Sequence, residues 1–358
     1  MKLFVKSKSP FPVRIWLFVG LVMIFFQVIL GGITRLTGSG LSITKWDIVT
    51  GIIPPLSEDA WQEAYQLYQQ TPQYEKVNKD MNLTAFKHIY FWEFIHRLWA
   101  RSMGFVFIFP LLYFLRKRWI HPRLKRDLWI VFFLAAIVAS FGWIMVASGL
   151  VNRPWVNAYK LMLHLSLAIL LFEYLLVTFV KNSGVPVSGK IPFGKNGKWL
   201  LGLLILVAFQ VMLGGLMSGM KAGFSYPSFP KMNGEWIPNI LMNPAEWTLV
   251  NMKNYDSGNL FATGLVQFVH RLTAYIIAIV GIILIKKVFS SDAHPAYKRL
   301  VAVLGLLLSL QITLGIFTLL GCRSGKVPLT LGVMHQAFGL LSLSCVVVIW
   351  FLNKKADV

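Results

Sequence analysis

Eight long apolar segments, separated by charged connections, restrict the fold of this chain more than any other feature. A helix needs about 20 residues to cross the roughly 30 Å hydrocarbon core of a bilayer. Only 14% of the 358 residues are charged, against about 25% in an ordinary soluble domain. We therefore predict an all-α polytopic membrane protein with transmembrane helices at about 15–33, 88–115, 128–151, 161–180, 199–220, 260–285, 300–321 and 327–352.

The Lys and Arg residues are divided unequally between the two sets of connections. The termini and the loops on their side carry 20 Lys and Arg against three acidic residues, whereas the opposite loops carry 12 against nine. Loops rich in Lys and Arg stay in the cytoplasm. We therefore expect both termini in the cytoplasm, and the net charge of +21 requires no nucleic-acid partner.

Two outer connections are long, at about 34–87 and 221–259. Residues 58–70 of the first have an amphipathic pattern, which predicts a short surface helix lying on the outer interface as a lid. The second is rich in Pro, Gly, Asn and Trp, and is predicted to be an irregular loop.

The sequence contains an internal repeat. Four pairs of segments correspond: Phe26–Gly32 with Phe209–Gly215, His96 with His270, His121-Pro122 with His294-Pro295, and His164 with His335. Each unit holds four spans, so the two units have the same orientation and are related by an axis along the membrane normal. We predict two pseudo-symmetric four-helix bundles, formed by residues 1–185, with the long outer loop, and 186–358.

Four of the seven histidines lie inside predicted spans, two in each half: His96, His164, His270 and His335. At about 1.5 Å per helical residue, all four lie roughly 24–30 Å from the basic boundary, toward the outer leaflet. A single intramembrane histidine is commonly a packing residue, but four at one depth in repeat-equivalent positions favour metal ligands. Two imidazoles facing each other are the axial ligands of a b-type haem.

Other metal sites fit this pattern less well. Zinc or copper would need a third or fourth ligand nearby, and no carboxylate accompanies the second histidine pair within the spans. Cys322 and Cys345, the only cysteines, lie in or beside apolar runs and match no histidine set. The residues therefore favour haem, and they assign neither cysteine a role.

An arginine follows each second-helix histidine, as Arg97 and Arg271. Positive charge at the outer end of a span opposes the orientation rule, so a local partner is expected. Haem propionates would be such partners, and the alternative is lipid phosphate at the interface.

Glu93 distinguishes the two halves, because it lies one turn before His96 whereas Gln267 holds the equivalent position before His270. A carboxylate inside a span is costly and is a candidate for function. We predict that Glu93 acts as an acid or base, or stabilises a cation, beside one haem only. Glu173 has no such neighbour and is expected to be a structural hydrogen-bonding residue.

Several blocks of the sequence resemble the haem A synthase family, in the branch shared by Gram-negative bacteria and mitochondria. The resemblance spans nearly the whole chain and rests on Gly31–Ser42, Trp46–Pro55, Tyr90–Arg97, Gly142–Leu150, Ala222–Gly234 and Val269–Tyr275. Some members carry a cysteine pair in an outer loop. This chain lacks one, so a thiol-based role does not carry over.

The resemblance implies oxidation of the C8 methyl of haem O to a formyl group by successive hydroxylations, which makes haem A for cytochrome oxidase. It implies that His96 and His164 flank the substrate haem O, with Glu93 catalytic. It also implies that His270 and His335 ligate a resident haem b.

The same resemblance implies a protein of the bacterial inner membrane. The expected partners are haem O, a haem O synthase, cytochrome oxidase assembly factors, an unidentified electron acceptor, the lipid bilayer and a second copy of the chain. A bis-haem b electron carrier or quinone oxidoreductase would account equally well for the four histidines, but it gives Glu93 no role. A transporter would need broken helix pairs, which the spans lack.

Overall fold

The computed structural model describes residues 9–44, 52–150, 153–184 and 197–356. Eight of the helices in these ranges are long and apolar enough to cross a membrane. They are α1 (Phe11–Leu36), α4 (Leu83–Arg116), α5 (Pro122–Ala147), α6 (Ala158–Asn182), α7 (Lys198–Gly219), α10 (Phe261–Phe289), α11 (Pro295–Gly321) and α12 (Leu329–Ala356). The prediction of an all-α chain with eight spans is confirmed.

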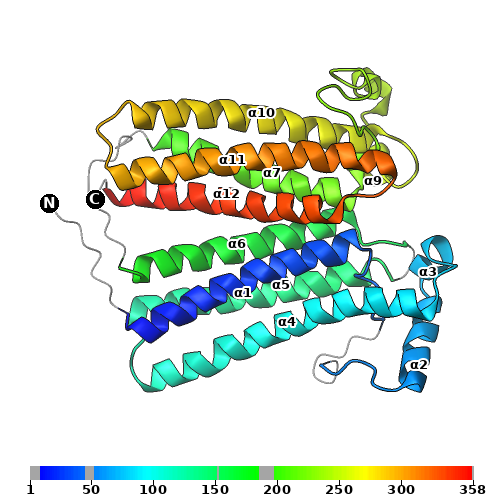
Figure 1. Ribbon diagram of the computed structural model, residues 1–358, viewed down its shortest axis with the longest axis horizontal. Coiled ribbons are helices and arrows are strands. Elements are labelled where there is room, and N and C mark those ends of the chain that lie inside the picture. The colour runs from blue at the N-terminus through cyan, green and yellow to red at the C-terminus, as the bar shows by residue number, and fades with distance from the viewer. Residues whose placement is uncertain (1–8, 45–51, 151–152, 185–196, 357–358) are drawn as a thin grey trace.

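Some sequence predictions fall outside the described residues. These are the basic residues before position 9 and the basic residues between 185 and 196. The part of the Trp46–Pro55 block up to residue 51 and the boundary between the halves at 185 and 186 also lie outside. The start of α1 and the end of α12 lie at the same end of the bundle (Figure 1).

The first and fourth helices of each half form the centre of the molecule. α1 contacts α4 and α6 of its own half and α12 of the other, while α7 contacts α10 and α12 of its own half and α6 of the other. These two sets of neighbours correspond under the sequence repeat, as a two-fold axis along the bundle requires. The remaining helices, α4, α5, α10 and α11, lie on the outside and bury smaller shares of their spans.

The two His-Pro pairs mark helix starts. The ring Nδ1 of His121 accepts a hydrogen bond from the Leu124 amide at 3.2 Å, and that of His294 accepts from the Ala296 amide at 3.3 Å. Each proline then takes the first helical position, where its missing N–H costs nothing. As a result α5 and α11 begin at 122 and 295 rather than near 128 and 300, because the caps set the start of a helix and the apolar run does not.

The predicted surface helix of the first outer connection is confirmed as α2 (Glu58–Gln69), which is followed by α3 (Pro72–Val77). Tyr68 of α2 is fully buried and stacks on Phe86 of α4, with ring centres 5.1 Å apart. This burial raises the pKa of Tyr68 to about 12. Gln73 of α3 donates to the Gly38 carbonyl at 2.8 Å, so the lid is fixed both to α4 and to the loop after α1.

The second outer connection is more ordered than predicted. It contains α8 (Asn239–Met242), α9 (Leu249–Lys253) and 3₁₀ turns at Ala222–Phe224 and Pro244–Glu246. The Thr248 hydroxyl caps α9 by accepting from the Asn251 amide, and the Asn243 side chain accepts from the Ala245 amide. The prediction of an irregular loop was wrong for these short segments, because Asn and Thr residues that suit loops also cap short helices.

Candidate functional site

His270 of α10 and His335 of α12 face each other inside the second half. Their ring centres are 6.5 Å apart, and the ring planes are inclined at 77°. An imidazole nitrogen binds a transition metal at about 2 Å, so a single metal ion between two imidazoles holds their ring centres about 6 Å apart. The observed separation therefore fits the axial ligation of one haem iron by this pair.

Backbone carbonyl groups orient the fourth-helix histidine of each half. His164 Nδ1 lies 3.0 Å from the Val138 carbonyl oxygen, and His335 Nδ1 lies 3.0 Å from that of Gln311. Val138 and Gln311 correspond in the sequence repeat. A hydrogen bond from Nδ1 to a carbonyl leaves Nε2 available to a metal, which is a common arrangement around metal-bound histidines.

Glutamine side chains accompany the second-helix histidines. Gln27 of α1 donates to the His96 carbonyl at 3.2 Å, and Gln210 of α7 donates to the His270 carbonyl at 3.0 Å. Gln210 Nε2 also lies 3.3 Å from His270 Nε2. The buried Nδ1 of His270 has no hydrogen-bond partner within the described part of the chain. Such an orphaned nitrogen is consistent with a ligand that the protein itself does not supply.

Each of the four histidines lies against a glycine on a neighbouring helix. A Cβ added to the glycine would approach the imidazole at 3.3 Å for Gly31 and His96, 2.9 Å for Gly142 and His164, 3.8 Å for Gly214 and His270, and 2.8 Å for Gly315 and His335. Sequence reasoning missed these glycines and the two glutamines. The repeat contained the signal, since Gln27 and Gly31 lie in the block that matches Gln210 and Gly214.

A single cavity of about 1290 Å³ connects the two histidine pairs. All the predicted site residues line it: Glu93, His96, Arg97, His164, His270, Arg271 and His335. Within the described residues, no group of three or more His, Cys, Asp or Glu side chains is placed to hold a metal ion.

Glu93 is buried and receives hydrogen bonds on both carboxylate oxygens. Arg97 Nη2 donates to Oε1 at 2.6 Å. Oε2 accepts from the Ser42 amide and hydroxyl, both at 2.7 Å, and from the Ile43 amide at 2.9 Å. Glu93 thus fixes the loop that follows α1 against α4, and Arg97 balances its charge.

Gln267 takes the place of Glu93 in the second half, without the charge. Its Nε2 donates to the Tyr226 carbonyl at 2.8 Å, and Arg271 Nη2 donates to the same oxygen at 2.9 Å. Arg271 also donates to the carbonyls of Ser228 and Pro230. The two halves therefore hold equivalent loops by different means, one through a carboxylate and the other through carbonyl groups.

The two arginines are engaged by the protein, so neither depends on lipid phosphate for a partner. The side chain of Arg97 is only 11% exposed and also donates to the Ile43 carbonyl at 3.2 Å. The buried Nε of Arg271 has no hydrogen-bond partner among the described residues. Because Arg271 lines the cavity, this free donor suits an anionic group such as a haem propionate.

Arg35, a cation that sequence reasoning missed, connects the two halves beside the cavity. It lies in the last turn of α1, and its Nη2 donates to the carbonyls of Ser218 at 2.6 Å and Gly219 at 3.3 Å. These carbonyls end α7, where the helix dipole favours positive charge. The signal in the sequence was a basic residue inside the Gly31–Ser42 block, on which the resemblance to the family partly rests.

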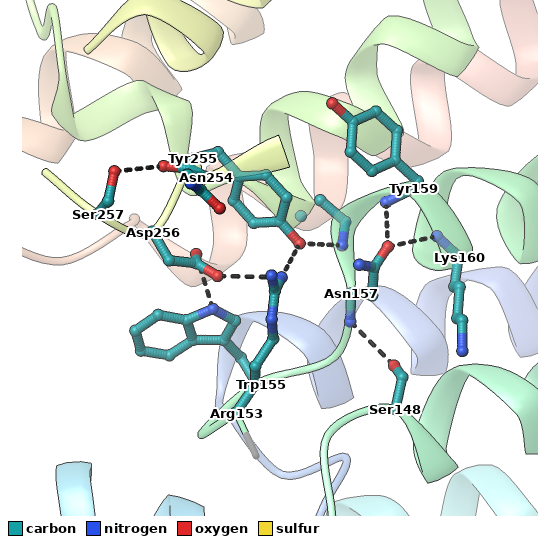
Figure 2. Close-up of polar contacts among 12 residues, drawn as sticks. Ser148, Arg153, Trp155, Asn157, Tyr159, Lys160, Asn254, Tyr255, Asp256 and Ser257 are labelled. Carbon is teal, nitrogen blue, oxygen red and sulfur yellow. Dashed lines mark hydrogen bonds and ion pairs between the residues drawn. The ribbon is translucent and has the colours of Figure 1, made fainter. Parts of the chain in front are cut away.

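A polar cluster between the α5–α6 connection and the loop before α10 also joins the halves (Figure 2). Arg153 lies 2.9 Å from the Tyr255 hydroxyl and 3.2 Å from Asp256 Oδ2. Trp155 Nε1 donates to Asp256 Oδ1 at 2.9 Å, and the Ala158 amide donates to the Tyr255 hydroxyl at 2.9 Å. The pKa of the Tyr255 hydroxyl is raised, mainly by burial, so this group stays protonated at neutral pH.

Glu173 lies apart from the cavity. Its Oε1 accepts from the Ser344 hydroxyl at 2.7 Å, which links α6 to α12. This hydrogen bond agrees with the structural role expected from the sequence, and it makes Glu173 a useful comparison for Glu93.

A known protein family and several individual proteins are similar to this chain over most of its length. A family model named COX15-CtaA, described as cytochrome oxidase assembly protein, matches residues 14–347. A "Heme A synthase" from Mesorhizobium japonicum is 40% identical over 96% of this chain and 91% of the relative. Proteins of the same name from Nitrosospira multiformis and Caulobacter vibrioides are 39% and 38% identical, and cover 92% and 94% of this chain.

Proposed function

The chain belongs to the COX15-CtaA family of cytochrome oxidase assembly proteins, and from that premise we propose that it acts as a haem A synthase of the bacterial inner membrane. In this role it oxidises the C8 methyl of haem O to a formyl group, which makes haem A for cytochrome oxidase. The proposal rests mainly on two equivalent histidine sites that line one cavity. Only one of these two sites has a buried carboxylate beside it.

The second half is the site proposed for a resident haem b. His270 and His335 have the separation of an axial pair, and Gly214 and Gly315 leave room beside the rings. Bound there, haem b would supply one-electron transfer between the substrate site and an external acceptor. The chain's own contribution is to fix His335 through Gln311 and to offer Arg271 to a propionate.

The first half is the site proposed for the substrate haem O. His96 and His164 would bind the substrate iron from its two faces, since each has the backbone and glycine environment of its counterpart in the second half. Glu93 lies one turn from His96 on α4, so its carboxylate would adjoin the substrate. Its negative charge stabilises a cation developing at the methyl carbon, and a carboxylate oxygen accepts the released proton.

The oxygen of the formyl group is proposed to come from water. Two histidines on the substrate iron leave no open position for binding O₂ there. Each round removes two electrons from the methyl carbon to the external acceptor, releases two protons and adds the oxygen of one water. The first round gives the alcohol, and the second gives the hydrated aldehyde, which loses water to become the formyl group. Labelled water that left no label in the formyl oxygen, with back-exchange controlled, would overturn this route.

The orientation in the membrane follows from the distribution of basic residues. We propose that both termini are cytoplasmic and that the lid of α2 and α3 lies on the outer side. A haem O synthase, cytochrome oxidase assembly factors and a second copy of the chain are proposed partners. Because Cys322 and Cys345 are both buried, single cysteines introduced at Glu58 and Arg123 can be labelled from one side of the membrane. Labelling of position 123 from outside intact cells would refute this orientation.

The function is tested by co-expressing the protein with a haem O synthase in a host without haem A, then extracting and separating the non-covalent haems. Haem A should accumulate with the unmodified chain and not with Glu93→Gln or His96→Ala. Unchanged haem O in every case would support a bis-haem electron carrier instead.

A further inference from the structure

The outer helices of the second half pack closely through two glycines. A Cβ added to Gly281 of α10 would lie 3.0 Å from Leu308 of α11. A Cβ added to Gly305 of α11 would lie 2.8 Å from Ile285 of α10. Leu308 is only 8% exposed. The seam between α10 and α11 is therefore closed around Leu308, which lines the cavity.

The first half carries phenylalanines where the second half has these glycines. By the offsets of the repeat, Phe107 of α4 corresponds to Gly281, and Phe132 of α5 corresponds to Gly305. The two rings stack on each other with centres 6.4 Å apart. Two large side chains between the helices keep the backbones from approaching as glycines allow. Accordingly, α10 packs along α11, whereas α4 and α5 make no comparable contact within the described residues.

The space left between α4 and α5 opens the cavity to the side. Ala135, Ala136 and Ala139 of α5 line the cavity and are exposed, on a helix that makes little contact with α4. Ala135 corresponds to the buried Leu308 of the other half. Gly104 of α4 also lines the cavity, and a Cβ added to it would meet nothing within 4 Å. These residues belong to membrane spans, so the opening faces lipid.

We propose that the seam between α4 and α5 is a lateral portal through which the substrate haem passes between the bilayer and the first histidine pair, with its prenyl tail lying in the seam. This proposal rests on the proposed function, because it assigns haem O to His96 and His164. An apolar slot of small side chains suits a long hydrocarbon chain. A substrate must enter and leave its site, whereas a closed seam retains a resident cofactor. The open seam of the first half and the closed seam of the second half match these two needs.

The test compares two glycines that have equally open surroundings. Gly104 and Gly202 both lie in spans and both have free space at Cβ, but only Gly104 lines the cavity. Gly104→Leu fills the portal, and Gly202→Leu adds the same bulk on α7, away from it. Ala135→Leu, which introduces the residue of the closed seam, is a second and independent variant. Resident haem content and the melting temperature show whether each variant has folded.

The measurement is the rate at which each purified protein, in nanodiscs with its resident haem, takes up haem O from phosphatidylcholine vesicles, followed by absorbance. We expect uptake by Gly104→Leu and Ala135→Leu to be about tenfold slower, as a modestly higher barrier produces, with Gly202→Leu unchanged. Uptake by the folded portal variants at the unmodified rate overturns the proposal, as does an equal slowing of Gly202→Leu. If uptake slows as expected but the unmodified protein makes no haem A, the portal stands and the proposed function fails.

Discussion

Arg97 donates from Nη2 to Glu93 Oε1 at 2.6 Å, and the two side chains are 11% and 3% exposed. The pair lies on one turn of α4 beside His96. At the equivalent turn of α10, Arg271 and Gln267 both donate to the carbonyl of Tyr226. One half of the molecule therefore holds a buried negative charge beside its histidines, and the other half holds none. Because the two histidine pairs have equivalent glutamine, carbonyl and glycine neighbours, this charge is the strongest reason to place the chemistry in the first half.

Glu93→Gln should abolish haem A formation while resident haem b remains bound. The amide keeps the size of the side chain and loses its charge, and removal of one electrostatic stabiliser typically lowers the rate by on the order of 10²–10³-fold. Haem A is measured in extracts and haem b in the purified protein. Glu173→Gln, which replaces a buried carboxyl outside the cavity by an amide, is the control and should retain activity. Substantial haem A from Glu93→Gln would remove Glu93 from the chemistry.

His335→Ala and His270→Ala should each lose the resident haem, whereas His96→Ala and His164→Ala should retain it and lose activity. The reason is that the two pairs are separate sites on one cavity, and removing an axial ligand affects only the haem it holds. Haem content per protein is read from the pyridine haemochrome spectrum. Equal haem loss in all four variants would contradict the division between the two sites.

Gly315→Ala should weaken binding of the resident haem, and Gly142→Ala should lower activity with that haem retained. The added Cβ would stand 2.8 Å from His335 and 2.9 Å from His164, so each ring must move. Overpacking of this kind costs about 1–3 kcal/mol. Haem content and haem A yield are compared with Gly202→Ala, whose Cβ enters open space. Normal haem content in Gly315→Ala would show that the imidazole has room to shift.

Tyr255→Phe should destabilise the protein by about 1–3 kcal/mol, because the lost hydroxyl leaves the buried Ala158 amide without its partner. Its effect is expected on the contact between the halves rather than on either histidine pair. The melting temperature of the purified protein is the measurement, and Tyr113→Phe, at a tyrosine that is 51% exposed, is the control. Equal melting temperatures for the two variants would mean that the cluster adds no stability.

Much of the architecture was predictable because it depends on local composition. Bilayer thickness sets the length of a spanning helix, so hydropathy alone located all eight. The repeat placed His96 with His270 and His164 with His335, and it distinguished Glu93 from Gln267. The start of α5 and the short helices near Asn239 and Leu249 were less predictable, because caps of one or two side chains decide them.

The sequence by itself determined the spans, the repeat, the four histidines and the unmatched carboxylate beside one histidine pair. The tertiary structure decided which groups meet them: Ser42, 51 residues from Glu93, donates to its carboxylate, and Gly315 makes room for His335. It also decided that the α10–α11 seam closes while the α4–α5 seam does not. These contacts join distant parts of the chain, and they depend on the volumes of the side chains where two helices cross. The periodicity of residues along a single helix does not encode those volumes.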